Sequence, residues 1–271
     1  MANGLAPSTI EEAVRANVSA GDTIYVGNFG AQLYVAGREL IRQGCRDLHV
    51  IAGSGGLLLD QLIGARVARA VTFAHCWNPI GPAPAWNLRR AAEASDPPVE
   101  IRELSLGVLN AAMQAAAWRV PFLPVSMSSE TGYTTDGWSR GMLTTVHCEF
   151  GTALAVKALR PDVAFVHADQ ADRLGNAVLA GPYGEHLAAA TAAVRTVVVA
   201  EAVMGAGERL PVPATLAGVH VQTVVLSPRA VWPDGAAGRY PRDIVEYKRY
   251  ATQSSTAAGF ATWLDSVRDP S

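Results

Sequence analysis

The sequence predicts an α/β fold, with an open, mostly parallel sheet and flanking helices. Short apolar runs alternate with amphipathic segments along all 271 residues. The runs "TVVVA" and "DVAFVHA" are almost wholly apolar, as strands covered on both faces must be. The sequence contains no internal repeat, low-complexity linker or compositional break, so we expect a single domain spanning residues 1–271.

Helices are predicted where apolar residues recur at helical spacing between start and stop signals. Ser8 or Thr9 is suited to cap the first helix, and Gly44 stops the second. The "DPP" run at 96–98 halts a later helix. The predicted helices cover residues 8–18, 33–44, 56–67, 85–95, 107–120, 149–160 and 186–195, and one terminal helix lies within 247–271.

Strands are predicted where short apolar or alternating runs lie between turn signals. The run "VEIREL" alternates, whereas the other runs are more continuously apolar. The predicted strands cover residues 22–27, 47–53, 69–76, 99–104, 162–168, 196–204 and 220–232.

Composition and charge exclude several classes of protein. The net charge is −2 and 17% of residues are charged, which favours neither nucleic acid nor an anionic membrane surface as a partner. The low charged fraction also fits a surface that is partly hidden in a subunit interface. We expect no signal peptide and no membrane span, since apolar runs stay short of the roughly 18 residues that a span needs. The three cysteines, Cys45, Cys76 and Cys148, predict a reducing cytoplasm without disulfides.

The glycines that follow the first two predicted strands do not form a dinucleotide fingerprint. The first exit reads Gly27-Asn28-Phe29-Gly30 and the second Gly53-Ser54-Gly55-Gly56, whereas a Rossmann loop needs G-x-G-x-x-G. The second exit nearly matches the G-x-S-x-G of serine hydrolases, but Ala52 occupies the first glycine position. Tight turns at the carboxyl edge of the sheet explain the glycines after both strands better than a dinucleotide site or a serine nucleophile does.

Two His-Cys pairs and one acidic loop are further candidates for chemistry. His75-Cys76 and His147-Cys148 each lie in or beside a strand, where neighbouring side chains point to opposite faces, so we expect no metal site. Glu130 lies among Ser and Thr residues in "VSMSSETGYTTDGW", where a carboxylate could act as acid, base or nucleophile. It could equally be an ordinary solvated acid. We expect His167, inside "AFVHA", to be a hydrogen-bonded core histidine.

Three segments resemble the α subunit of family I coenzyme A transferases, of the glutaconate and 3-oxoacid type. The first is "AGDTIYVGNFG", similar to a family loop G-x-x-I-x-x-G-G-F, and the second is "ELSLGVLNAAMQAAAWRVPFLPV". The third is "LRPDVAFVHADQADRLGNAVL", in which Asp172, Gly175 and Asn176 match an A-D-x-x-G-N element. The resemblance covers nearly the whole chain and implies the α-subunit architecture of that family.

The resemblance also implies a mechanism and a partner. In this family a glutamate carboxylate of the β subunit, in an S-E-N-G motif, attacks the acyl-CoA thioester. Here the corresponding place holds "AGSGG", without an acid. "SSETG" at 128–132 lies too late in the chain to be its equivalent. The implied arrangement is an α subunit that completes a site on a separate β-type chain, as a heterodimer or an α2β2 assembly. Coenzyme A enters as part of the substrate, and no bound cofactor is expected.

Two departures from the family pattern affect the acyl pocket. Leu106 and Val108 replace the glutamine and threonine of the usual Q-G-T, and the glutamine supplies a polar contact to the acyl group in transferases. Segments of the chain also resemble heteromeric hydrolases that open the last ring in steroid breakdown, which place an α-subunit glutamate about where Leu106 stands. Asn28 replaces the second glycine of the early loop, and we expect its amide to supply part of the missing polarity.

Three functions therefore remain open. The first is CoA transfer between carboxylic acids with a β-type partner. The second is a CoA-dependent C–C hydrolase or lyase of the same fold, in which Glu103 or Glu130 replaces the lost acid. The third is a non-catalytic subunit that binds an acyl-CoA or scaffolds its partner.

The expected substrate-binding residues follow the carboxyl ends of the predicted strands, where open α/β sheets place their ligands. For Phe29 and Trp77, packing in a subunit interface is an equal alternative. The full set is Asn28, Phe29, Gly30, Ser54, Gly55, His75, Trp77, Asn78, Ser105, Gly107, Ser128 and Ser129.

Overall fold

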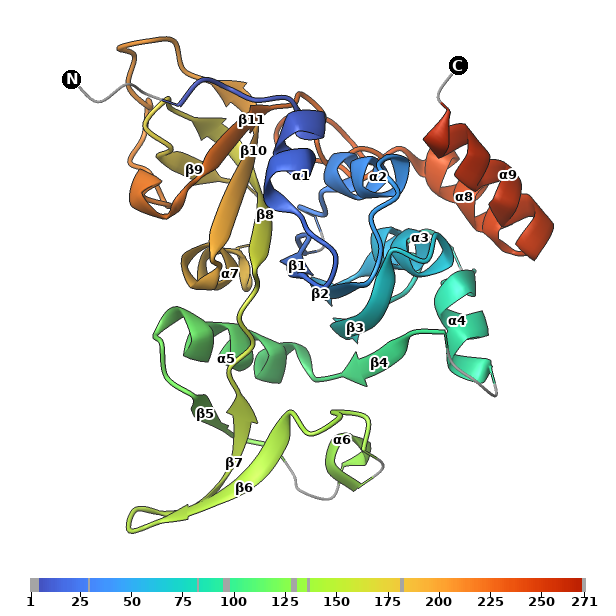
Figure 1. Cartoon of the computed structure of the whole chain (residues 1–271), viewed down its shortest axis with the longest axis vertical. Coiled ribbons are helices and arrows are strands. Elements are labelled where there is room, and N and C mark those ends of the chain that lie inside the picture. Colours follow the sequence, from blue (N-terminus) through green and yellow to red (C-terminus); the bar gives the residue numbers. More distant parts are fainter. Residues whose placement is uncertain are drawn as a thin grey trace.

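A large, mostly parallel sheet forms the centre of the protein (Figure 1). The computed structural model describes residues 5–28, 30–81, 83–94, 98–127, 131–135, 137–180 and 183–269. In these residues seven strands follow the order β11-β10-β8-β1-β2-β3-β4 with parallel pairing, and β9 pairs antiparallel with β8. The predicted fold class is confirmed. The strands are β1 (Thr23–Tyr25), β2 (Leu48–Ser54), β3 (Ala68–His75), β4 (Glu100–Glu103), β8 (Val163–Ala171), β9 (Ala177–Leu179), β10 (Arg195–Val203) and β11 (Thr223–Leu226).

Helices cover both faces of this sheet. Residues of α1, α2 and α3 join one buried cluster with one face, and residues of α5 and α7 join a second cluster with the other face. A 3-10 turn covers Gly218–His220. The α-helices that precede this 3-10 turn in the chain are α1 (Ile10–Asn17), α2 (Tyr34–Arg42), α3 (Gly56–Gly64), α4 (Trp86–Glu93), α5 (Leu106–Ala117), α6 (Gly132–Thr135) and α7 (His186–Ala192).

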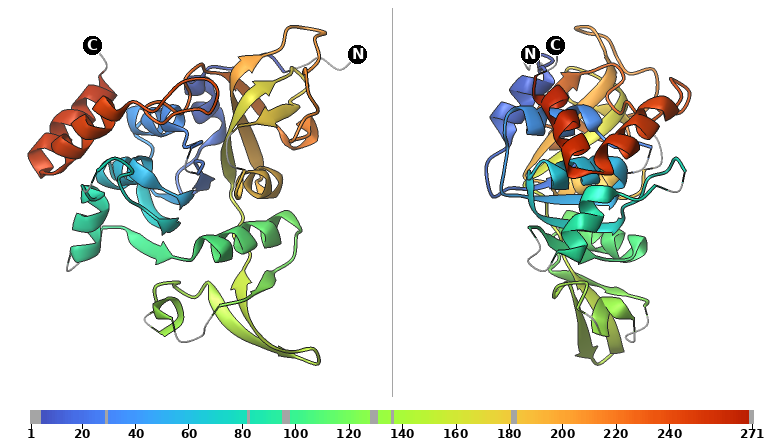
Figure 2. Two further views of the ribbon diagram at one scale, coloured as in Figure 1. Left: turned by 180° about the vertical axis from the view of Figure 1, so that it is seen from behind. Right: turned by 90° about the vertical axis from the view of Figure 1, so that its right-hand side faces the viewer.

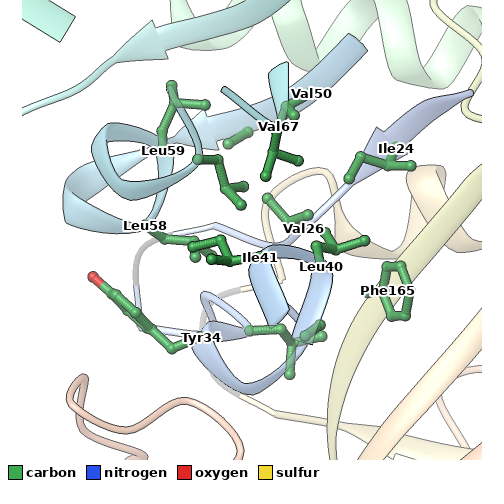
Figure 3. Close-up of a cluster of buried hydrophobic side chains, with 14 of the residues drawn as sticks. Ile24, Val26, Tyr34, Leu40, Ile41, Val50, Leu58, Leu59, Val67 and Phe165 are labelled. Carbon is green, nitrogen blue, oxygen red and sulfur yellow. The ribbon is translucent and has the colours of Figure 1, made fainter. Parts of the chain in front are cut away.

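The apolar strands supply both clusters because neighbouring side chains alternate between the two faces. In β8, Val163 and Phe165 enter the first cluster, while Ala164 and Val166 enter the second. Figure 3 shows part of the first cluster, where Leu58 of α3 and Ile41 of α2 lie against the sheet. Burial on both faces is therefore the reason that these strands read as continuous apolar runs.

The first helix begins as predicted. Thr9 is the N-cap: its hydroxyl accepts a hydrogen bond from Glu12 N (3.1 Å), and the Glu12 carboxylate accepts one from Thr9 N (2.9 Å). This reciprocal pair is a capping box, which satisfies two backbone donors at the helix start. Ser8, the alternative cap, instead donates to Glu12.

The helix predicted over 149–160 is wrong. Residues Gly151–Lys157 form β7, which pairs antiparallel with β5 (Phe122–Val125) and β6 (Leu143–Cys148). This three-stranded sheet, the arm, projects from one end of the molecule (Figures 1 and 2). Gly151 has a φ of +124° at the β6–β7 turn, a conformation that favours glycine. Ala, Leu and Lys suggested a helix, but hairpin pairing with the neighbouring β6 and pairing with the more distant β5 override that local preference.

Two predictions near the carboxyl terminus also need correction. The terminal region forms two helices rather than one, α8 (Ile244–Ser254) and α9 (Ala257–Arg268). Thr256 lies between them with extended backbone and accepts a hydrogen bond from Gly259 N (3.0 Å), so it caps a new helix. The observed strand is shorter than the one predicted over 220–232: β11 ends at Leu226, two residues before Pro228, which has no N–H to donate to a sheet.

A buried carboxylate fastens α8, the first of the two terminal helices, to α3 and α4. Asp60 of α3 is fully buried and accepts hydrogen bonds from Tyr250 Oη (2.7 Å), Asn87 Nδ2 (3.0 Å) and Leu88 N (2.9 Å). Burial raises the pKa of this carboxyl, and these donors oppose the increase. Asp60 thus joins α3, α4 and α8 on the face of the sheet that α1, α2 and α3 cover. No helix in the described part of the chain is long and apolar enough to cross a bilayer.

We expect acid to destabilise the fold through His49. Its ring is buried on β2, 2.8 Å from Thr72 Oγ1, and burial, with a contribution from Arg102 and Arg69, lowers its pKa to about 4. The neutral ring is therefore favoured in the folded state, and its stabilisation is complete above the unfolded pKa of roughly 6.5. As the pH falls from there to 4, roughly 2–3 kcal/mol of unfolding free energy should be lost.

Urea unfolding of the wild type and of His49→Gln between pH 7.5 and 4 checks this. The variant should show a shallower decline of unfolding free energy with falling pH. His186, whose pKa burial lowers to about 3, remains in both proteins. Parallel stability curves for the two proteins would contradict the assignment to His49.

Candidate active site at the carboxyl edge of the sheet

Polar residues gather where four neighbouring parallel strands end. Asn28 follows β1, Ser54 ends β2, His75 ends β3 and Glu103 ends β4. Because β1, β2, β3 and β4 are adjacent and parallel, their carboxyl ends lie along one edge, which is where open α/β sheets bind ligands. These residues therefore lie at the edge of the sheet where the sequence analysis expected them.

Ser54 and His75 form a close pair at this edge. Ser54 Oγ lies 2.5 Å from His75 Nε2, and Gln32 Nε2 donates to the Ser54 carbonyl. Ser54 is buried, whereas the His75 side chain is exposed. Gly55 N donates to the His75 carbonyl (2.9 Å). In a serine hydrolase, the N–H after the nucleophile stabilises the oxyanion, so this engaged N–H disfavours a serine hydrolase.

Trp77 and Asn78 continue the edge beyond β3. Trp77 is half exposed, with its ring 6.4 Å from that of His75. Asn78 is buried, and its Oδ1 accepts from Ile80 N (3.0 Å). Its Nδ2 has no hydrogen-bond partner among the described residues. A buried donor without a partner is costly, so this amide is an energetic exception in the edge.

The start of α5 lies beside the end of β4. Ser105 is the N-cap, and its hydroxyl accepts a hydrogen bond from Val108 N (3.3 Å). Leu106 and Gly107 are both exposed. An exposed leucine at the position of the altered Q-G-T makes this part of the edge apolar, as the sequence implied.

Glu185, which the sequence analysis did not single out, lies under the exits of β1 and β2. It is buried, and Oε1 accepts from Gly53 N (3.0 Å) and Tyr25 Oη (3.3 Å) while Oε2 accepts from Asn28 Nδ2 (2.9 Å). Burial raises the pKa of Glu185, and the hydrogen bonds from Gly53, Tyr25 and Asn28 oppose that increase. The available signal was an acid directly before the Ala-rich helix, after "GPYG".

Glu103 occupies a small cavity of its own. The cavity, of about 200 Å³, is lined by Glu103, Gly132, Tyr133 and Trp138. Partial burial raises the pKa of Glu103, and Glu103 N donates to the Trp138 carbonyl (2.9 Å). A carboxyl with a raised pKa beside aromatic side chains is suited to donate or accept a proton.

Four predicted site residues, Phe29, Ser128, Ser129 and Glu130, lie outside the described residues. Gly30 is described: its N–H donates to the buried carboxylate of Asp234 (3.0 Å), which also binds Arg242 (2.7 Å). This loop is therefore held from the side of the carboxyl-terminal segment.

The sequence also drew attention to His167 and to the pair His147-Cys148. His167 is buried with Nε2 2.9 Å from Glu201 Oε1, which confirms it as a core histidine. His147 and Cys148 lie exposed on the arm, and the three cysteines are free. In the described residues no group of three or more His, Cys, Asp or Glu side chains is placed to hold a metal ion.

A family model for coenzyme A transferases matches residues 8–227 of this chain. The chain belongs to the coenzyme A transferase family. It is 33% identical to a subunit of the 3-oxoadipate CoA-transferase of Pseudomonas knackmussii, over 95% of this chain and 91% of that protein. It is 29% identical to the cholesterol ring-cleaving hydrolase IpdA subunit of Mycobacterium tuberculosis, over 95% of this chain and 91% of that protein. The crystal structure of glutaconate coenzyme A-transferase from Acidaminococcus fermentans matches with a TM-score of 0.89 and 28% identity, covering 97% of this chain and 88% of that one.

Neither of the two carboxylates described at this edge is exposed beside Ser54 and His75. Glu185 is buried with both oxygens engaged, and Glu103 opens into a separate cavity. The predicted polar contribution of Asn28 also takes an unexpected form, because its buried amide donates to Glu185. The described part of the edge therefore places no accessible carboxylate beside Ser54 and His75.

Proposed function

We propose that this chain is the α-type subunit of a heteromeric enzyme that transfers CoA between carboxylic acids. Its carboxyl edge forms one wall of the acyl-CoA site, and a β-type partner supplies the nucleophilic glutamate. The observation that carries the proposal is the state of Glu185, whose burial and three hydrogen bonds prevent it from attacking a thioester. Family membership supports the same arrangement.

The reaction has two halves, in which the partner's glutamate carboxylate first takes CoA from the donor and then passes it to the acceptor acid. The partner's carboxylate attacks the thioester carbonyl, the C–S bond breaks, and a mixed acyl–glutamyl anhydride and CoA thiolate result. The thiolate then attacks the glutamyl carbonyl and releases the acyl group as its carboxylate. The reverse sequence passes CoA to the acceptor acid. The role of this chain is to hold the acyl group against Ser54, His75 and nearby backbone, so that the reacting carbonyl meets the partner's carboxylate.

A dicarboxylic acyl group suits this edge best. Two relatives are named for 3-oxoadipate and glutaconate, both of which carry a second carboxylate. The Ser54 hydroxyl and the exposed His75 ring could bind that carboxylate, with Trp77 alongside its carbon chain. CoA enters as part of the substrate, so no resident cofactor is proposed. CoA substrates and the free cysteines both favour the cytoplasm.

Co-expression with a β-type chain that carries S-E-N-G tests the proposal. The purified pair is mixed with 3-oxoadipyl-CoA or glutaconyl-CoA and acetate, and the CoA esters are separated by chromatography. We expect acetyl-CoA from the pair and none from this chain alone. Release of free CoA or of a C–C cleavage product without acetyl-CoA would favour a hydrolase. No turnover of either kind by this pair would leave a binding or scaffolding role for this chain.

The second candidate is a CoA-dependent C–C hydrolase, and Glu103 is the observation that favours it. Its raised pKa and its aromatic cavity fit a general acid or base, whose removal typically costs about 10²–10⁴-fold in rate. If the enzyme is a transferase, Glu103→Gln should change kcat of the assembled pair by less than about threefold, well below that range. A loss of hydrolysis by 100-fold or more in the same variant would assign the reaction to Glu103.

A further inference from the structure

We propose that Glu185 is a positioning residue of the acyl-CoA site, which fixes the exits of β1 and β2 through one shared carboxylate. It does not touch the substrate, and it acts through the residues that do. The reaction that it serves is the proposed CoA transfer, so the inference rests on that function. The clamp consists of Glu185, Gly53, Asn28 and Tyr25.

The clamp connects the two loops that wall the site. Gly53 directly precedes Ser54, and Asn28 begins the loop that leads to Gly30. Glu185 accepts from Gly53 N at 3.0 Å and from Asn28 Nδ2 at 2.9 Å, one on each oxygen. A single rigid carboxylate therefore sets the separation of the β1 exit from the β2 exit, and with it the position of Ser54.

The surroundings leave the carboxylate little freedom to move. A methyl group on Gly53 would overlap Glu185 Oε1, and a Cβ at Gly184 would lie 2.7 Å from Asn28 Nδ2. Tyr25 Oη lies 3.3 Å from both Glu185 Oε1 and His186 Nδ1, and the Tyr25 and His186 rings meet edge to face at 5.6 Å. Tyr25 of β1 and His186 of α7 thus form a buried wall beside the Glu185 carboxylate.

The side chain at position 185 must offer hydrogen-bond acceptors and no donor, because its three partners all donate. Gly53 N–H, the Asn28 amide and the Tyr25 hydroxyl are all able to donate, and an ionised carboxylate can accept from all of them. A glutamine at 185 keeps the shape but has one oxygen, so its NH2 group would face another donor. An aspartate at 28 would turn that clash into a hydrogen bond by accepting from the new NH2 group.

The pairing can therefore be tested by exchanging the two groups. We compare Glu185→Gln, Asn28→Asp and the double variant in the full chain assembled with its partner. Each single variant should lower kcat by about 100-fold with KM changed less than threefold, since a misplaced wall weakens contacts made at the reacting centre. The double variant should recover to within about tenfold of the wild type, as expected for a coupled pair.

Asp60→Asn is the matched control for a purely structural effect. Asp60 is also a buried carboxylate with three donors, but it lies on α3 and its donors come from α4 and α8. Asp60→Asn should lower the thermal midpoint and leave kcat unchanged. If Glu185→Gln behaves in the same way, or if the double variant is no better than the singles, the inference is overturned.

A second readout separates the clamp from the proposed reaction. Hydrogen–deuterium exchange of the assembled protein follows peptides covering 26–34 and 52–58. Exchange there should speed up by about tenfold in each single variant, through easier local opening, return towards wild type in the double variant, and stay unchanged in Asp60→Asn. If this exchange pattern is found but the wild-type pair transfers no CoA, the proposed function is rejected and the clamp stands. Unchanged exchange in the single variants would reject the clamp.

Discussion

Gly53→Ala is expected to lower kcat of the assembled enzyme by about 100-fold or more. The added methyl group would overlap the Glu185 carboxylate, which lies 3.0 Å from Gly53 N and is buried on all sides. Either the carboxylate or the β2 exit must move, and both responses shift Ser54 from its place beside His75. Steady-state kinetics of CoA transfer by the purified pair measure the effect.

Gly37→Ala is the control for this prediction. A methyl group there would overlap the end of the Leu58 side chain between α2 and α3, which is away from the carboxyl edge. It should cost stability but keep kcat within about threefold of wild type, because repacking in the core leaves the site contacts in place. Equal losses of kcat in both variants would show that general loosening, rather than the β2 exit, governs activity.

Trp263→Ala should lower the free energy of unfolding by about 3–5 kcal/mol. Trp263 of α9 is 1% exposed, and its ring meets Tyr250 at 4.9 Å and Phe260 at 5.4 Å. Removing it leaves a cavity between the terminal helices and also exposes the Tyr250–Asp60 hydrogen bond (2.7 Å). Urea unfolding at pH 7.5 gives the change directly.

Val245→Ala tests whether that loss depends on burial. Val245 lies on α8 and is 77% exposed, so its truncation should change the unfolding free energy by no more than about 0.5 kcal/mol. If Trp263→Ala cost as little as Val245→Ala, the terminal helices would not be part of the cooperative fold.

Much of the main sheet could be predicted from sequence because its strands are buried on both faces. The run 162–168 reads as a strand without reference to any partner, and β8 covers Val163–Ala171. The arm could not be predicted in this way. Residues 149–160 have helix-forming composition, and β7 exists because Val156 and Leu154 pair with β6 in a hairpin and with the more distant residues of β5.

The placement of the candidate site residues was predictable as far as topology determines it. Ser54 and His75 follow adjacent parallel strands, and the structure brings them to 2.5 Å. Glu185 was not predictable, because its contacts with Asn28 and Gly53 cross more than a hundred residues of chain. Asn28 shows the same limit: the sequence indicated a polar group in the wall, but its partner is a buried carboxylate from another layer of the fold.

Trapping the reaction intermediate tests the central claim most directly. The assembled pair is incubated with acyl-CoA in the absence of an acceptor, treated with borohydride, and digested for mass mapping of both chains. Borohydride reduces a glutamyl-CoA thioester to an alcohol, which marks the nucleophile. We expect the mark on a glutamate of the partner chain, with Glu103, Glu130 and Glu185 of this chain unmodified. A reduced glutamate in this chain would contradict the account, since it would place the nucleophile on the chain that we propose only binds and orients the substrate.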